Sequence, residues 1–306
     1  MSTSPVYIGV DVAKATLALD GFRRDFPNTP AAHSQIIKSL PAAAHIVVEA
    51  SGGYQKALVR ALHRAGVPVS TVNARHPREY AKSMGQLAKT DKIDKAVLSA
   101  FAEHKALKPD KPPTQAEEKL AEMLSRREQL VAMRITEKNR FEHHFDTFVK
   151  KQAAKALRSI ERWIAEIDTA VSKLIDSDTV LKAKSETIRK IDGIGPVCAA
   201  GMLGYIPELG TLSRNAASAL AGLAPYADDS GTIRGKRKIY GGRAAPRALL
   251  YMAALTAARK NPILMLFYQR LRKAGKPFKV AIVAVMRKLI MLINQTLKNP
   301  NFVLAS

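Results

Sequence analysis

The chain has 306 residues, of which 47% are hydrophobic, a composition typical of a soluble globular protein with more than one domain. Lys and Arg total 49 against 26 Asp and Glu, so the formal net charge is +23 and a nucleic acid is the expected partner. The single cysteine, Cys198, excludes an internal disulfide and a cysteine zinc site, which favours the cytoplasm. No signal-peptide pattern and no 18-residue uncharged apolar run is found, so we expect no membrane segment.

Residues 5–108 alternate between short apolar runs and helical patterns, as in an α/β domain. We expect strands at 7–12, 16–20, 22–26, 45–50 and 67–72, and helices at 31–40 and 54–65. Helical stretches follow after Pro77 and from Thr90 or Asp91 to about Lys105. The order of three strands, helix, strand, helix and strand is typical of ribonuclease-H-like folds.

Acidic residues lie at the ends of two of these strands. Asp11 ends the first apolar run, Glu49 ends the fourth, and Asp91 and Asp94 share one face of a predicted helix. Acids in a first helical turn also favour the helix dipole, which is an alternative explanation for that pair. Four carboxylates held together repel unless cations lie among them, and oxygen ligands suit Mg²⁺ or Mn²⁺. Two such ions would stabilise the attacking and leaving oxygens of a phosphoryl transfer.

The segment 108–113 contains three prolines and is predicted to be a stiff linker at a domain boundary. Residues 115–174 predict two long helices with a break near 148–152. Spacings of four and three residues define a heptad seam at Ala153, Leu157, Ile160, Ile164, Ile167, Val171 and Leu174. The seam predicts a coiled coil, either a hairpin within one chain or an interface between chains, and we slightly favour the second.

The adjacent His143 and His144 point in different directions on a helix and form no metal-ligand pair.

Residues 191–197 have the alternating hydrophobic and glycine pattern of a helix-hairpin-helix. Gly193 and Gly195 would let backbone N–H groups approach a phosphate at the start of the second helix. A plain turn between helices is the alternative.

Beyond Asp229 the chain contains no acidic residue, and residues 231–306 carry 16 Lys and Arg. This predicts a surface that lies against phosphates. The candidate nucleic-acid-binding side chains are Arg234, Lys236, Arg237, Lys238, Arg243 and Arg247. Ser230 precedes these cations beside a glycine, where a serine is either a turn residue or a nucleophile that attacks a phosphodiester. Tyr240 is a competing nucleophile, although the Arg and His constellation of tyrosine recombinases is not recognisable.

Several of these motifs occur together in one order: Gly-Val-Asp-Val-Ala-Lys at 9–14, Val-Glu-Ala-Ser-Gly at 48–52, Lys-Thr-Asp-Lys-Ile-Asp at 89–94, the glycine hairpin at 191–195, and Gly-Leu-Ala-Pro at 222–225 through Ser230. In this combination the chain resembles the DEDD transposases of the insertion-sequence one-hundred-and-ten family, which are bridge-RNA-guided recombinases. The resemblance extends over essentially the whole chain, including 241–243, 251–252 and 287–289.

The resemblance implies three domains: a RuvC-like (ribonuclease-H-like) catalytic domain at 1–110, a coiled-coil helical linker at 111–185, and a mostly helical transposase domain with the helix-hairpin-helix at 186–306. It implies metal-binding acids at Asp11, Glu49, Asp91 and Asp94 and a nucleophile at Ser230. It also implies a structured noncoding guide RNA that pairs with donor and target DNA, and dimers that assemble into tetramers. The serine of one subunit would meet the acidic site of another, in the bacterial cytoplasm and on the nucleoid when active.

Two positions depart from the family pattern. Lys95 follows Asp94 where a small residue is more usual, and Asp228 and Asp229 add negative charge before Ser230. The second departure leaves open whether the serine loop meets the metal site directly or whether Asp229 assists as a ligand or base. Two other functions remain: a RuvC-like junction endonuclease that uses a metal-bound water, and a nucleic-acid-binding protein with degenerate catalytic residues. The intact set of four acids argues against the latter.

Overall fold

The computed structural model describes residues 4–50, 52–86, 91–226, 235, 237–299 and 301–302, without the side chains of 91–93. The chain divides into two compact units, Met1–Pro112 and Pro113–Ser306. Each unit has its own hydrophobic core. The boundary falls within the proline-rich segment that the sequence marks as a linker.

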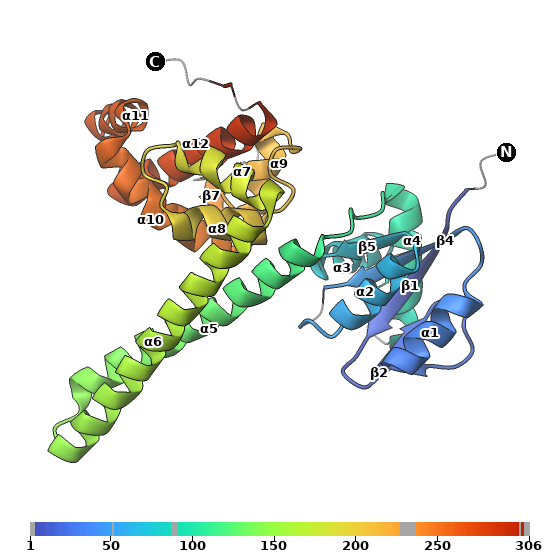
Figure 1. Cartoon of the computed structure of the whole chain (residues 1–306). Coiled ribbons are helices and arrows are strands. Elements are labelled where there is room, and N and C mark those ends of the chain that lie inside the picture. Colours follow the sequence, from blue (N-terminus) through green and yellow to red (C-terminus); the bar gives the residue numbers. More distant parts are fainter. Residues whose placement is uncertain are drawn as a thin grey trace. The chain divides into compact units, whose positions relative to one another are not determined.

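The first unit is built on a mixed five-stranded sheet (Figure 1). Its strands are β1 (Val6–Val12), β2 (Thr16–Leu19), β3 (Phe26–Pro27), β4 (Ala44–Glu49) and β5 (Val69–Val72), in the order β3-β2-β1-β4-β5. The central strand β1 pairs antiparallel with β2 and parallel with β4, and β4 pairs parallel with β5. Central strands that are covered on both faces need apolar residues at successive positions, which explains the runs in β1 and β4.

Helices cover both faces of this sheet. They are α1 (Pro30–Ser39), α2 (Lys56–Arg64), α3 (Arg75–Ser83) and α4 (Asp91–Lys105). Ile36 of α1 and Leu58 of α2 pack against alternate residues of the strands, such as Val48. Leu98 of α4 packs with Val47, the neighbour of Val48 on β4. Because successive side chains of a strand point to opposite faces, α4 lies on the face opposite α1 and α2.

The third strand differs from the prediction. The sequence predicts a strand at 22–26, but β3 contains only Phe26–Pro27. Gly21 forms a turn with a φ of 78°, Phe22 packs against the core from that turn, and residues 23–25 are charged and exposed. Exposed charged side chains bury no apolar surface when they join a sheet, so the strand is shorter than the sequence predicts. The other predicted strands and helices of this unit are present within a few residues.

The linker that leaves the first unit lies along the edge strand β5. Asp110 donates its backbone N–H to Val69 O at 2.7 Å, and its carboxylate accepts the N–H of Thr71 at 2.7 Å. The Ser70 hydroxyl donates to Lys108 O at 2.8 Å. The two bonds of Asp110 satisfy backbone groups of β5 at the edge of the sheet, and the Ser70 bond holds the linker beside them.

The second unit begins with an antiparallel hairpin of two long helices, α5 (Gln115–His143) and α6 (Thr147–Ser177) (Figure 1). The predicted heptad seam on α6 faces α5, where Leu130 packs against Ile160 and Ile164. The intrachain alternative is therefore correct for the seam, and the expectation that favoured an interface between chains is wrong. The helices break at 144–146 rather than 148–152, because Asp146 caps α6 by accepting the N–H of Val149.

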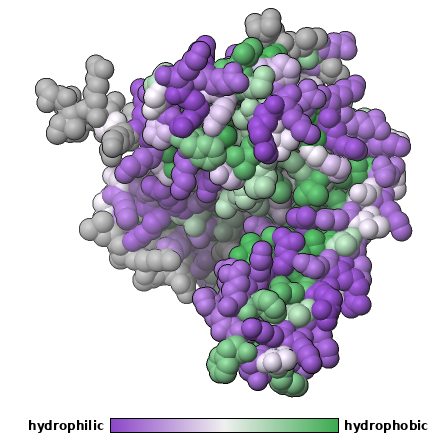
Figure 2. All heavy atoms as spheres, turned by 90° about the vertical axis from the view of Figure 1, so that its left-hand side faces the viewer, coloured by the Kyte–Doolittle hydropathy of each residue, from purple (hydrophilic) through white to green (hydrophobic). Residues whose placement is uncertain are grey.

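The described residues of this unit form six further helices and a two-stranded ribbon. The helices are α7 (Thr179–Arg189), α8 (Pro196–Tyr205), α9 (Arg214–Leu220), α10 (Ala244–Lys260), α11 (Pro262–Lys273) and α12 (Phe278–Lys298), and the ribbon consists of β6 (Pro225–Tyr226) and β7 (Lys238–Ile239). One core joins them to the base of the hairpin through residues such as Leu124 and Val171. Figure 2 shows a largely hydrophilic surface with separate hydrophobic areas.

Among the described residues, α12 is the one helix that is long and apolar enough to cross a membrane. In this fold 56% of its apolar stretch is buried inside the protein. Leu289, Ile290 and Ile293 are fully buried against the neighbouring helices. The burial accounts for the apolar sequence of α12 as that of a core helix.

Candidate active site

Asp11 is the second-last residue of β1 and Glu49 is the last residue of β4, which are neighbouring parallel strands. The register of β1 and β4 pairs Val10 with Val48, and the next residue on each strand is one of these acids. The carboxyl ends of adjacent parallel strands meet at the same edge of a sheet, which is where ligands bind in open α/β sheets. Both side chains are partly buried. The sheet therefore places two of the predicted acids side by side.

The helix α4 approaches the same edge because it runs antiparallel to β1. Tyr7 donates its hydroxyl to Leu107 O at 3.0 Å, beyond the end of α4, while Gly9 donates its N–H to the Ser99 Oγ at 2.8 Å. A Cβ on Gly9 would lie 2.1 Å from Lys95 O, so the backbones are in direct contact. Residues nearer the C-terminal end of β1 therefore contact residues nearer the N-terminal end of α4.

This progression brings the first turn of α4 toward Asp11. Asp94 precedes Lys95 and is partly buried. The side chain of Asp91 and all of Ser230, Arg234 and Lys236 lie outside the described residues. No group of three or more His, Cys, Asp and Glu within the described part of the chain is arranged to hold a metal ion. The full set of four acids therefore stays a prediction, although its carboxylate donors are those that hard divalent cations prefer.

Two of the predicted nucleic-acid-binding arginines, Arg243 and Arg247, lie at the start of α10. Arg243 donates to both carboxylate oxygens of Glu208, at 2.6 and 2.9 Å, and Arg247 donates to Gly241 O at 2.9 Å. Burial would raise the pKa of Glu208, but the hydrogen bond and charge of Arg243 outweigh it and lower that pKa. Both arginines thus make intramolecular bonds, and their predicted contact with nucleic acid is untested. Arg237, by contrast, is exposed.

The predicted helix-hairpin-helix corresponds to α7, a turn and α8. Gly193 has a φ of 102°, and a Cβ there would lie 2.7 Å from the backbone of Ala257 on α10. Packing therefore explains the glycine at 193, whereas Gly195 caps α8 with open space around it. Pro196 and Val197, in the first turn of α8, are exposed.

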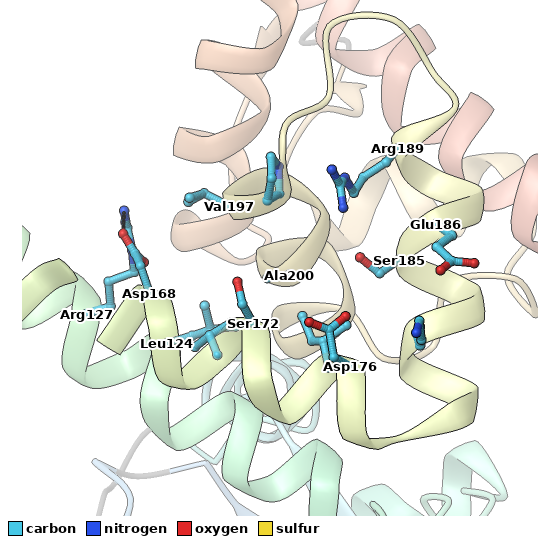
Figure 3. Close-up of a pocket in the computed structure, with 14 residues that line it drawn as sticks. Leu124, Arg127, Asp168, Ser172, Asp176, Ser185, Glu186, Arg189, Val197 and Ala200 are labelled. Carbon is cyan, nitrogen blue, oxygen red and sulfur yellow. Dashed lines mark hydrogen bonds and ion pairs between the residues drawn. The ribbon is translucent and has the colours of Figure 1, made fainter. Parts of the chain in front are cut away.

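A cavity of about 250 Å³ adjoins this turn (Figure 3). In Figure 3 the Arg189 side chain points from α7 toward the first turn of α8. Arg127 and Asp168, which form an ion pair, lie at another side of the cavity, and Asp176 and Glu186 add two further carboxylates. The cavity therefore carries charges of both signs and presents no dominant charge to a polyanion.

Comparison with protein families gives two matches, the first of which extends from the sheet through α5 of the helical hairpin. A family model described as a transposase matches residues 8–150. A second model, described as the transposase IS116/IS110/IS902 family, matches residues 185–269. The chain belongs to this transposase family.

Two curated relatives of the transposase are pilin gene-inverting proteins, from Moraxella lacunata and Moraxella bovis. Each is 28% identical over 305 residues, which cover 94% of this chain and 94% of the relative. The likeness thus includes the sheet, the helical hairpin and the C-terminal helices. This likeness and the family matches together show that the transposase is an enzyme of DNA recombination and that its substrate is DNA. The DEDD transposase domain suggests dependence on a divalent metal ion.

The structure also identifies two residues of the transposase that the sequence did not reveal as part of the site. Gly9 lets α4 approach β1, and the Ser99 hydroxyl accepts the N–H of Gly9. A glycine inside an otherwise β-branched strand is the sequence signal for such a close approach. Ser99 has no comparable signal, since a serine in a helix is usually a solvent-exposed residue.

Proposed function

We propose that the transposase is a guide-RNA-dependent recombinase that cleaves and exchanges strands between donor and target DNA. Its first unit would be a RuvC-like catalytic domain, and Ser230 its nucleophile. The observation that carries the proposal is the meeting of Asp11 and Glu49 at adjacent strand ends beside the first turn of α4. The relatives' name, pilin gene-inverting protein, supports a reaction in which a DNA segment is rearranged.

The acids have a defined part in this proposal. Asp11, Glu49, Asp91 and Asp94 would hold Mg²⁺, or Mn²⁺ in its place, through carboxylate oxygens. A bound divalent cation supplies charge stabilisation at the oxygens of the reacting phosphodiester. The protein's own contribution is to fix the carboxylates on two strands and one helix, so that they need no reorganisation when DNA arrives.

Ser230 would perform the covalent step. Its hydroxyl loses a proton and its oxygen forms a bond to phosphorus, while the bond from phosphorus to the leaving strand's oxygen breaks. The leaving oxygen takes up a proton and becomes a free hydroxyl. The hydroxyl of the exchanged strand then attacks the serine-linked phosphorus in the reverse sense and releases Ser230. Support comes from the cations that follow Ser230 in the sequence and from the family resemblance.

Assembly of several copies is part of the proposal. Phe145 and Phe148, at the tip of the helical hairpin, are 94% and 69% exposed. Exposed aromatic side chains of this size are typical of interaction surfaces. We assign the tip to contacts between copies in a dimer or tetramer, in which Ser230 of one subunit acts at the acids of another. The enzyme would work in the cytoplasm, on the nucleoid, with a structured noncoding RNA that pairs with both DNAs.

The decisive experiment looks for a covalent intermediate. The protein is incubated with Mg²⁺, co-purified RNA and labelled donor DNA, and a denaturation-resistant protein–DNA adduct is sought. We expect an adduct with the wild type and none with Ser230→Ala. Cleaved DNA without an adduct in either protein would instead establish the RuvC-like endonuclease that uses water as nucleophile. Asp11→Ala should abolish adduct formation while DNA binding is retained.

A further inference from the structure

The β6–β7 ribbon presents two tyrosine rings on its exposed face. Tyr226 pairs with Lys238, and Tyr240 follows Lys238 by two residues, so strand alternation places all three on one face. Ile239, between Lys238 and Tyr240, packs against the helical core from the other face. The centroids of the Tyr226 and Tyr240 rings are 4.3 Å apart, and the residues are 39% and 50% exposed.

The end of the ribbon is fixed to the helices that follow and precede it. Arg243 donates its backbone N–H to Leu220 O at 2.7 Å, which joins the chain three residues after Tyr240 to the last residue of α9. A Cβ on Gly242 would lie 2.1 Å from the backbone N of Gly222, so these two chain segments are in direct contact. The ribbon that bears Tyr226 and Tyr240 is therefore held in place against α9 and the start of α10.

The positive charge around the tyrosine pair is complementary to the phosphates of a nucleic acid. Lys238 lies on the same face, Arg237 beside it is exposed, and residues 231–306 contain no acid. Aromatic rings with nearby cations are the recurring means of binding unpaired bases, because every base has a face that stacks. Bases within an intact duplex are already stacked on their neighbours, so the platform fits an unpaired base.

We propose that Tyr226 and Tyr240 form a stacking platform for one unpaired nucleobase of the DNA strand that Ser230 attacks. Ser230 is four residues from Tyr226, and a chain of that length spans at most about 14 Å. The stacked base therefore lies within a few nucleotides of the reacting phosphodiester. The identity of the strand rests on the proposed function of Ser230, whereas the stacking itself does not.

The test measures binding in the full-length Ser230→Ala protein, so that no chemistry interferes. The probe is a DNA duplex with a short single-stranded gap that contains 2-aminopurine, whose fluorescence falls when it stacks on a ring. Replacing both tyrosines by Leu keeps an apolar contact across the ribbon but removes the rings. We expect the fluorescence change to disappear and the gapped DNA to bind about 5- to 100-fold more weakly. The double Phe variant should bind like the parent.

Three controls make the outcome specific. Trp163→Leu removes an aromatic residue of α6 that is 40% exposed, and it should leave the fluorescence change intact. The double Leu variant should bind fully paired duplex with less than a twofold change. Equal weakening on gapped and paired DNA would show that the tyrosines only hold the ribbon together, and would overturn the proposal. A fluorescence change with the matching RNA but not with the DNA would overturn it as well.

The adduct assay separates this inference from the proposed function. Tyr240→Phe, made in the otherwise wild-type chain, should still form the covalent adduct, because a ring without its hydroxyl can stack. An adduct that is lost in Tyr240→Phe and retained in Ser230→Ala would make Tyr240 the nucleophile and overturn both statements. No adduct in any variant, together with ring-dependent fluorescence, would overturn the serine chemistry alone.

Discussion

Gly9 is the residue at which the sheet of the first unit touches α4. We expect Gly9→Ala to destabilise this unit by about 1–3 kcal/mol, because overpacking forces backbone shifts. The added Cβ would lie 2.1 Å from Lys95 O and 2.6 Å from the Leu98 Cβ, so α4 must move away from Asp11. Thermal unfolding and the adduct assay measure the two effects. Gly195→Ala, with a φ of −89° and nothing within 4 Å of the new Cβ, introduces no clash and should lower the unfolding temperature less, because only the N-cap preference of α8 for glycine over alanine is lost.

Glu208 gives the second unit a dependence on pH. Burial would raise the pKa of its carboxyl, but Arg243 outweighs burial and lowers that pKa below the ordinary value. A lowered pKa in the folded state means that the stabilisation is fully present above the ordinary pKa of 4.5 and is lost as the pH falls through the folded value. We therefore expect the melting temperature of wild type to fall more steeply than that of Glu208→Gln between pH 5 and about 3. Parallel curves would contradict this role.

The candidate acids show which roles of single residues can be predicted from the sequence. Asp11 and Glu49 are predictable because a carboxylate at the end of an apolar run is conspicuous, and the register of β1 and β4 places them together. The roles of Arg243 and Gly193 could not be found in this way. Their partners, Glu208 and Ala257, are distant in sequence, and no local pattern encodes such pairings.

At the scale of elements, the ion pair between Arg127 on α5 and Asp168 on α6 joins the two arms of the hairpin. The Arg127 side chain is 20% exposed, and its guanidinium donates twice to the carboxylate. We expect Arg127→Met to lower the free energy of unfolding by about 1–3 kcal/mol, because the partly buried carboxylate loses its partner. Arg162→Met removes the exposed pair with Glu166 on the same helix, and should cost at most about 0.5 kcal/mol. Denaturant unfolding of the two variants compares them directly.

Elements with a strong period were predictable, and pairings between elements were not. The apolar runs and the heptad seam located most strands and both long helices. The partner of the seam could not be chosen, since a heptad pattern is satisfied equally by a helix of the same chain or of another. The strand predicted at 22–26 is too long because the apolar residues Phe22 and Phe26 favour a strand. In the structure Phe22 packs against the core from a turn instead.

At the scale of the whole molecule, charge is concentrated in the last quarter of the chain. We expect Arg237→Gln with Lys238→Gln to weaken binding to duplex DNA at low salt. The slope of log K against log salt should fall by about 0.9 for each phosphate that the protein no longer neutralises. Both residues are exposed on or beside the ribbon. Lys150→Gln with Lys151→Gln removes the same charge from α6 and is the matched control. Equal slopes for the two double variants would show that only total charge matters.

The contact between the linker and β5 has a consequence for association of the protein with itself. An open edge strand offers unpaired backbone groups to any other strand, and is a common origin of aggregation. Here Asp110 and Lys108 bond to β5, while at the opposite edge β3 is two residues long and contains Pro27. Both ends of the sheet are thus closed to further strands. A fragment that stopped before Lys108 would leave β5 open and should aggregate, even though every strand and helix of its sheet would be retained.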